Sequence, residues 1–172
     1  LAADPTPFIR AKIAAGDIAS AEAILEDARA ASGETSEFWK AASWVARGAL
    51  YRRDFATARH WAEVALHGAT KALAGKSFDK EPDLETAIGA SLEVLGQLEA
   101  ARGKHKDAIE FFRMHLNLYK GTAIEKRLRK NWNLLALTGK PAPAINGELP
   151  KSALIFLWAH YCGDCKAQAP AV

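Results

Sequence analysis

The stretch LEVLGQLEAARGKHKDAIEFFRMHL, residues 92–116, decides the fold of most of this chain. Gly103 marks a turn between two segments rich in alanine and leucine. Apolar residues recur three and four positions apart in both segments, a spacing typical of amphipathic helices. Small residues at Gly96 and Ala108 allow the two helices to approach closely. The stretch therefore predicts a helical hairpin whose apolar positions are Leu92, Leu95, Gly96, Ala108, Phe112 and Leu116.

The turn of this hairpin has two counterparts earlier in the chain. The segments GDIASAE (residues 16–22), RDFATAR (53–59) and GKHKDAI (103–109) align without gaps, each with alanine five positions after the turn residue. The first two start 37 residues apart, close to the period of about 34 residues of tetratricopeptide repeats. The third lies 50 residues further on, and residues 75–82 have the turn composition expected of an insertion.

The pattern resembles a tetratricopeptide repeat, most clearly in the third hairpin. The fold class that we predict is mainly α: three tetratricopeptide-like helical hairpins in residues 1–137, closed by a capping helix over Thr122–Leu137. Only Pro7–Ala15 is available as the leading helix of the first hairpin. The capping helix carries Ile124, Leu128, Trp132 and Leu135 on one face, and it suits either a solubilising cap or a bridge to a following domain.

Charge is nearly balanced over the chain, with a formal net charge of +3, which does not argue for nucleic acid binding. No apolar run approaches the roughly 20 residues of a membrane span. The basic excess is local and suits either a solvated helix face or contact with an acidic partner. It consists of Lys120, Lys126, Arg127, Arg129 and Lys130 against Glu125.

Both cysteines lie in the segment WAHYCGDCK, residues 158–166. After a Pro-rich linker over residues 138–150, the apolar run Leu154–Trp158 has the length of a buried strand, and helix-compatible residues 166–170 follow the cysteines. A thiol at a helix N-terminus has a lowered pKa. We therefore expect Cys162 to attack a substrate disulfide and Cys165, three residues later, to resolve the mixed disulfide.

From about Gly139 to Val172 the chain is similar to the thioredoxin superfamily, in particular to TlpA-like thiol–disulfide oxidoreductases. The resemblance rests on GKPAP (139–143), FLWA (156–159), the CxxC pair, Lys166 and the helix-kinking Pro170, with Tyr161 where tryptophan is usual. It implies that residues 151–172 are the first strand and active-site turn of a thioredoxin-like domain. It also implies a protein dithiol or disulfide substrate, no cofactor beyond the Cys162–Cys165 disulfide, and an extracytoplasmic location, periplasmic or secreted.

The chain departs from that family in several places. Gly-Asp separates the cysteines instead of the common Gly-Pro. Phe156 stands where some relatives have a buried acid or an asparagine, and Gln168 stands where TlpA-like proteins often have glutamate. The further strands and the cis-proline loop of the family are not in this sequence. We expect either a parent protein that continues beyond Val172, without which this part is inactive, or a remnant. Asp164 should raise the pKa of Cys162 by charge repulsion, and a protonated His160 would oppose this.

Several alternatives stay open at the level of sequence. The CxxC pair is half of a zinc site, but His160 would bring it to three ligands at most, so we predict no metal. Trp39, Trp44, Trp61 and Trp132 suit repeat packing or an aromatic groove, and His60, His67 and His115 suit helix faces. An unpaired strand at 154–158 would pack on the helical domain, pair with a second chain or belong to a larger parent protein. A non-enzymatic scaffold that binds a protein or peptide on its repeats is the competing function.

Overall fold

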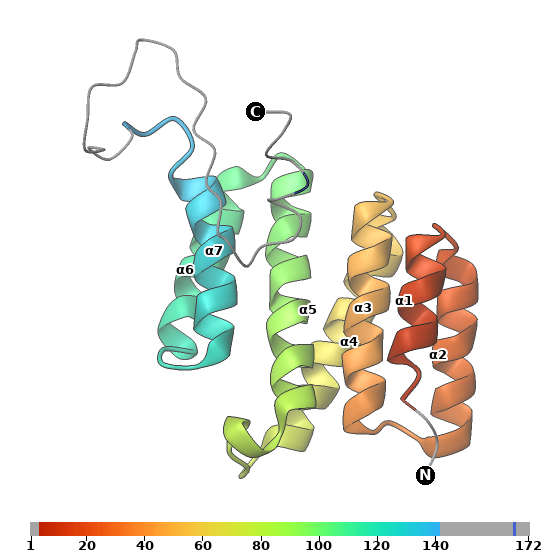
Figure 1. Ribbon diagram of the computed structural model, residues 1–172. Coiled ribbons are helices and arrows are strands. Elements are labelled where there is room, and N and C mark those ends of the chain that lie inside the picture. The colour runs from red at the N-terminus through yellow and green to blue at the C-terminus, as the bar shows by residue number, and fades with distance from the viewer. Residues whose placement is uncertain (1–3, 142–166, 168–172) are drawn as a thin grey trace. The chain divides into compact units, whose positions relative to one another are not determined.

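The computed structural model describes residues 4–141 and Ala167 (Figure 1). The described residues contain no strand, which confirms the mainly α prediction for this part of the chain. The expected strand at 154–158 and the cysteine turn lie outside the described residues. The helices are α1 (Thr6–Ala14), α2 (Ile18–Ser32), α3 (Ser36–Tyr51), α4 (Phe55–Leu73), the short 3₁₀ helix η1 (Phe78–Lys80), α5 (Pro82–Ala101), α6 (His105–Leu118) and α7 (Ala123–Ala136).

The helices of the unit that ends at Thr138 form two layers. The leading helices α1, α3, α5 and α7 contact one another in this order, and the trailing helices α2, α4 and α6 each pack against two leading helices. Because a single hairpin cannot bury its apolar face alone, this stacking gives the hairpins one continuous core. None of the described helices combines the length and the hydropathy that a membrane crossing requires.

The three hairpins turn in the same way and at the predicted residues. The turn residues Gly16, Arg53 and Gly103 have φ angles of 79°, 64° and 82°. In the first turn, Gly16 N–H donates to Ile13 O and Asp17 N–H to Lys12 O, both at 2.9 Å. This pair of bonds is a Schellman motif, and the same pair recurs after α3 and after α5. The three turns that align in sequence therefore share one backbone conformation.

The trailing helices begin differently in spite of their similar turns. Asp17 accepts a hydrogen bond from Ser20 N–H at 3.0 Å, and Asp54 accepts one from Thr57 N–H at 3.1 Å. Each carboxylate thereby satisfies one of the free N–H groups of a first helical turn. Lys104 occupies the same position before α6, and its side chain makes no capping bond.

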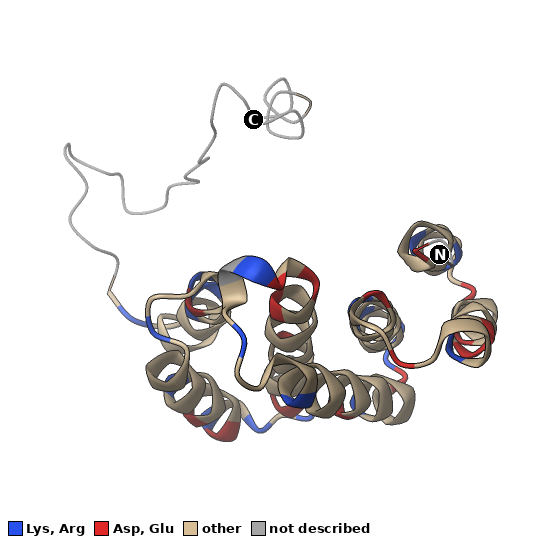
Figure 2. Ribbon diagram, turned by 90° about the horizontal axis from the view of Figure 1, so that it is seen from below, with Lys and Arg blue, Asp and Glu red and all other residues tan. Residues whose placement is uncertain are grey.

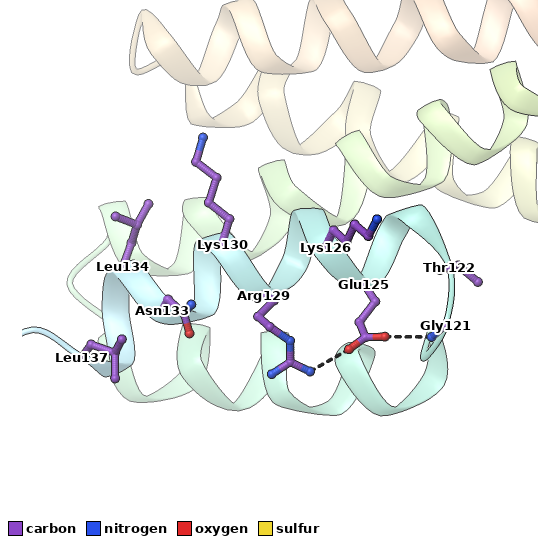
Figure 3. Close-up of a pocket in the computed structure, with 9 residues that line it drawn as sticks. All are labelled: Gly121, Thr122, Glu125, Lys126, Arg129, Lys130, Asn133, Leu134 and Leu137. Atoms are coloured by element: carbon purple, nitrogen blue, oxygen red, sulfur yellow. Dashed lines mark hydrogen bonds and ion pairs between the residues drawn. The ribbon is translucent and has the colours of Figure 1, made fainter. Parts of the chain in front are cut away.

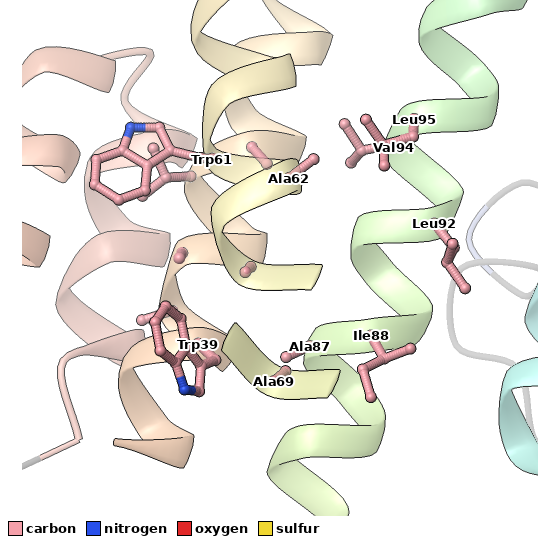
Figure 4. Packing of buried hydrophobic residues seen from close by; sticks show 14 of the residues in the cluster. Trp39, Trp61, Ala62, Ala69, Ala87, Ile88, Leu92, Val94 and Leu95 are labelled. Carbon is pink, nitrogen blue, oxygen red and sulfur yellow. The ribbon is translucent and has the colours of Figure 1, made fainter. Parts of the chain in front are cut away.

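Small residues hold the two layers together, as the sequence predicts. Ala21, Ala58 and Ala108, each five positions after a turn residue, are completely buried. Phe112 is also fully buried and lies over Gly96, where a β-carbon would stand 2.3 Å from the ring atom Cζ. Figure 4 shows part of this core, including the buried Trp39 of α3 and the buried Trp61 of α4.

The structure contains the predicted helix after the third hairpin and the predicted insertion before it. α7 buries Ile124 and Leu128 and packs Trp132 and Leu135 against the core, while Gly139 follows with a φ angle of 74°. The insertion before the third hairpin is an irregular segment that contains η1, and α5 begins at Pro82. Proline suits this position because the first helical residue needs no N–H donor.

Candidate protein-binding surface

The residues that sequence reasoning singled out for catalysis lie outside the described part of the chain. This holds for Cys162 and Cys165 and for the modulating residues His160, Tyr161, Asp164 and Pro170. Ala167 alone is described in this region; it is helical and exposed. The thiol chemistry therefore stays a prediction, and the candidate surfaces described below belong to the helical unit.

Five side chains connect all four leading helices in one line, which we call the Arg–Trp row: Arg10, Trp44, Arg47, Glu93 and Arg127. The guanidinium carbons of Arg10 and Arg47 lie 4.6 Å and 4.9 Å from the ring centroid of Trp44. Glu93 Oε2 then accepts hydrogen bonds from Arg47 Nη2 and Arg127 Nη1, both at 2.9 Å. The row thus runs from α1 through α3 and α5 to α7.

Amide side chains extend the row along α5 and α7. Asn131 is buried and donates from Nδ2 to Glu93 Oε1 at 3.3 Å, and Gln97 Nε2 donates to Asn131 Oδ1 at 2.6 Å. The carboxylate of Glu93 is therefore occupied on both oxygens. Such a saturated network fixes the rotamers of its members, which a recognition surface requires.

The Arg–Trp row carries more positive than negative charge. It holds three guanidinium cations and one carboxylate, and the side chains of Arg47 and Arg127 are each 34% exposed. Partly exposed guanidinium groups can still donate hydrogen bonds to the carboxylate of a partner. The row is consequently suited to a protein or peptide that presents acidic side chains.

A second charged cluster ties the N-terminal segment to the leading layer. Lys40 Nζ lies 2.9 Å from Asp4 Oδ2 and 3.0 Å from Asp83 Oδ1. Burial alone would raise the pKa of Asp4, but the hydrogen bonds from Thr6 and Lys40 outweigh it, so the pKa is lowered. Burial likewise opposes the charge of Lys40, yet its bonds to the two carboxylates raise the pKa of the ammonium group. One ammonium group shared by two carboxylates leaves this cluster with a net charge of −1, so it adds nothing to the positive charge of the Arg–Trp row.

The exposed face of α7 is the second surface with functional character (Figure 3). Every residue drawn there comes from α7 or from the residues immediately around it, so the feature is an open helix face and not an enclosed cavity. Glu125 accepts hydrogen bonds from Gly121 N–H and from Arg129 Nη2, both at 2.7 Å. Lys126, Lys130, Leu134 and Leu137 point outward along the same helix.

The aromatic and histidine residues mostly follow the structural reading of the sequence. Trp39 and Trp61 are 5% and 3% exposed, which confirms repeat packing for both, and Trp132 packs partly against the core. Trp44 differs because it is half-buried and stacked with arginine. His60 and His67 are exposed on helix faces, as predicted. Within residues 4–141, no group of three potential ligand side chains could hold a metal ion.

The Arg–Trp row was missed by sequence reasoning, although one signal for it exists. Arg10 and Arg47 each stand six residues before the turn residue of their hairpin, so the repeat alignment places them at equivalent positions of neighbouring helices. No known protein family, curated protein or solved structure matches this chain.

Proposed function

We propose that this protein is a thiol–disulfide oxidoreductase of the thioredoxin-like class whose helical repeat domain holds its protein partner. The observation that carries the proposal is the order of two features along the chain. Three hairpins with one shared turn geometry come first, and the CxxC pair at Cys162 and Cys165 follows. The resemblance of residues 139–172 to TlpA-like oxidoreductases also implies that the protein acts outside the cytoplasm.

The hairpin packing supports the assignment to tetratricopeptide-like repeats. Gly96 and Ala108 are the small residues at which the helices of the third hairpin cross, and Phe112 closes the contact. Leading helices that contact leading helices, with trailing helices in the second layer, are the arrangement expected of stacked helical hairpins. Such arrays present extended surfaces to protein partners.

The reaction that we propose is a two-electron exchange between the Cys162–Cys165 dithiol and a disulfide of the substrate protein. The Cys162 thiolate attacks one sulfur of a substrate disulfide and forms a mixed disulfide, while the other substrate sulfur leaves as a thiolate. The Cys165 thiolate then attacks Cys162 Sγ, which releases the second substrate thiolate. The substrate gains two electrons, the protein is left with a Cys162–Cys165 disulfide, and the released thiolates take up protons from water.

The Arg–Trp row is the part of the helical unit best suited to hold such a partner. Its surplus of guanidinium groups, its stacked Trp44 and the saturated carboxylate of Glu93 form a rigid surface of positive charge. An acidic segment of the substrate protein bound there would tether the substrate to the same chain as Cys162 and Cys165, and tethering raises the effective concentration of two reacting groups.

A non-enzymatic scaffold is the second candidate, because repeat domains bind partners without any redox chemistry. In that case the helical unit alone would account for the function, and the cysteines would be inert. The two candidates predict different behaviour of cysteine variants, since a scaffold needs neither thiol.

Reduction of insulin by the product of the complete gene tests the proposal. We expect turnover with dithiothreitol as electron donor, its loss in Cys162→Ser, and accumulation of a mixed disulfide in Cys165→Ser because the resolving thiol is missing. Substitution of the exposed His67 by Ser, far from the motif in sequence, serves as the matched control and should leave the rate unchanged. Equal rates in the wild type and Cys162→Ser would favour the scaffold.

A further inference from the structure

The outer face of α7 carries one continuous stripe of exposed residues, which we call the α7 stripe: Lys126, Lys130, Leu134 and Leu137. These positions follow the spacing i, i+4, i+8 and i+11, so they share one face of the helix. The opposite face holds Ile124 and Leu128, which are buried against the hairpins. The α7 stripe is basic in its first half and apolar in its second half.

The structure divides the local basic excess into paired and unpaired charges. Arg127 pairs with Glu93 in the Arg–Trp row, and Arg129 pairs with Glu125 at 2.7 Å. Lys126 and Lys130 form no ion pair with any carboxylate of the described residues, and both are exposed. Two ammonium groups one helical turn apart thus face outward together.

The apolar half of the α7 stripe is exposed among the described residues. Leu134 is 63% exposed and Leu137 is 55% exposed, and neighbouring large apolar side chains on a surface are typical of an interaction site. Leu134 also borders a hollow of about 430 Å³ together with Tyr51, Phe55 and Leu135. An apolar side chain of a partner placed over Leu134 can therefore enter a hollow whose lining is mainly aromatic and aliphatic, with Arg53, Gln97 and Asn131 as its polar members.

We propose that the α7 stripe is a docking site for an acidic amphipathic helix of another protein. Helical spacing of the four residues matches a helix laid along α7, and apolar anchors at such spacing are a common mode of helix recognition. The two unpaired ammonium groups select carboxylates on the same face of the partner. This inference does not depend on the thiol chemistry proposed above.

Charge also argues against a second copy of this chain as the occupant. If two α7 stripes packed in parallel, Lys126 and Lys130 of one copy would lie against Lys126 and Lys130 of the other copy, and these like charges would repel. If they packed antiparallel, the ammonium groups would be desolvated against Leu134 and Leu137 without a counter-charge. An acidic partner avoids both costs.

The test uses the 172-residue chain and a labelled synthetic helix as probe. The probe carries two glutamates four residues apart and two leucines three residues apart on one face, and it is made in both sequence orders. We expect saturable binding by fluorescence anisotropy, at least tenfold weaker with K126E/K130E and at least tenfold weaker with L134Q/L137Q. The double variant K71E/K106E changes the same amount of charge at exposed lysines of α4 and α6 and should bind as the wild type does.

Other outcomes would overturn the proposal. Equal weakening by K71E/K106E, or equal binding of a probe in which serine replaces both leucines, would mean unspecific charge attraction. A dimer in sedimentation that L134Q/L137Q dissociates would make a second copy the occupant. Binding to vesicles with anionic lipid, lost in K126E/K130E and without binding of either probe, would make the surface a membrane contact. Circular dichroism of each variant checks that the helices remain folded.

Discussion

The ring of Phe112 lies so close to Gly96 that a β-carbon at residue 96 would be 2.3 Å from Cζ and 2.6 Å from Cε1. Both residues are buried, one in α5 and one in α6, so the third hairpin is closed by a contact that only glycine allows. The same relation holds between Gly68 and Trp39 in the second hairpin, where the distance to the ring is also 2.3 Å. The close approach of the helices thus depends on glycine, which has no side chain, at residues 68 and 96.

Gly96→Ala should destabilise the protein although alanine favours helices. The gain in helix propensity is about 1 kcal/mol, while overpacking of a filled core costs about 1–3 kcal/mol and more when a ring cannot move. We expect a net loss of about 1–2 kcal/mol in urea unfolding. Gly89→Ala is the matched control: its β-carbon would lie 3.3 Å from Ile124 Cγ1, which a shift of a few tenths of an ångström relieves, so we expect a smaller loss than for Gly96→Ala.

Combining Gly96→Ala with Phe112→Leu separates the clash from other effects. Leucine is smaller than phenylalanine, so the double variant should lose less stability than the sum of the single losses. Strict additivity of the two changes would show that the ring does not limit residue 96.

Arg53→Gly should stabilise the protein. Arg53 has a φ angle of 64° and is the single non-glycine residue with positive φ among the described residues. The left-handed conformation costs a non-glycine residue about 1–2 kcal/mol. Glycine avoids this cost, but its greater freedom in the unfolded chain offsets part of the gain in stability. We expect a gain of about 0.5–1 kcal/mol and a higher Tm. Arg52→Gly, at a φ angle of −82°, should give no gain.

Lys104→Asn should stabilise α6 by supplying the cap that the other two turns have. The backbone at Lys104 resembles that at Asp17 and Asp54, with a φ angle of −88° against −95° and −80°. A capping side chain contributes about 1 kcal/mol, so we expect a gain of about 0.5–1 kcal/mol in thermal or urea unfolding. Lys104→Ala removes the same charge without a cap, and an equal gain there would contradict the explanation.

Asp4→Asn should change stability in a pH-dependent way. The pKa of Asp4 is lowered from 3.8 in the folded protein, so its contribution is present above that value and disappears as pH falls through the folded pKa. The pKa of Lys40 is raised from 10.5, so its contribution disappears only as pH rises above that value. Tm of the variant should lie below that of the wild type between about pH 5 and 9 and converge with it in acid.

The matched control for this prediction is Asp27→Asn. Asp27 is exposed on α2 and makes no ion pair with any described residue. A Tm difference for Asp4→Asn that persists unchanged to pH 2 would show that the Asp4–Lys40 contact contributes nothing through its charge.

Local patterns predict the hairpins because the information lies within a few residues. Gly16, Arg53 and Gly103 mark the turns, and an alanine five positions later marks the buried contact, so spacing alone places them. The Arg–Trp row could not be placed in this way. Arg47 and Glu93 are 46 residues apart, and Arg127 lies 34 residues from Glu93, so their contact depends on the rotation of three packed helices.

The division of charge on α7 is likewise a property of packing. The sequence groups Arg127, Arg129 and Lys130 into one basic run, but neighbouring positions of a helix point in different directions. Arg127 turns toward Glu93, Arg129 bonds Glu125, and Lys130 stays exposed. The cysteine motif remains the opposite case, with a strong local pattern whose residues the structure does not describe.

The most direct test of the central claim is a redox titration of Cys162 and Cys165 in the product of the complete gene. The protein is equilibrated in glutathione buffers of graded potential, and free thiols are then tagged with a maleimide that adds mass. We predict a single two-electron transition between the dithiol and the Cys162–Cys165 disulfide, with a midpoint between about −270 and −120 mV, and no such transition in Cys165→Ser. Two thiols that stay reduced at every potential in this range would contradict the oxidoreductase assignment and leave a helical scaffold.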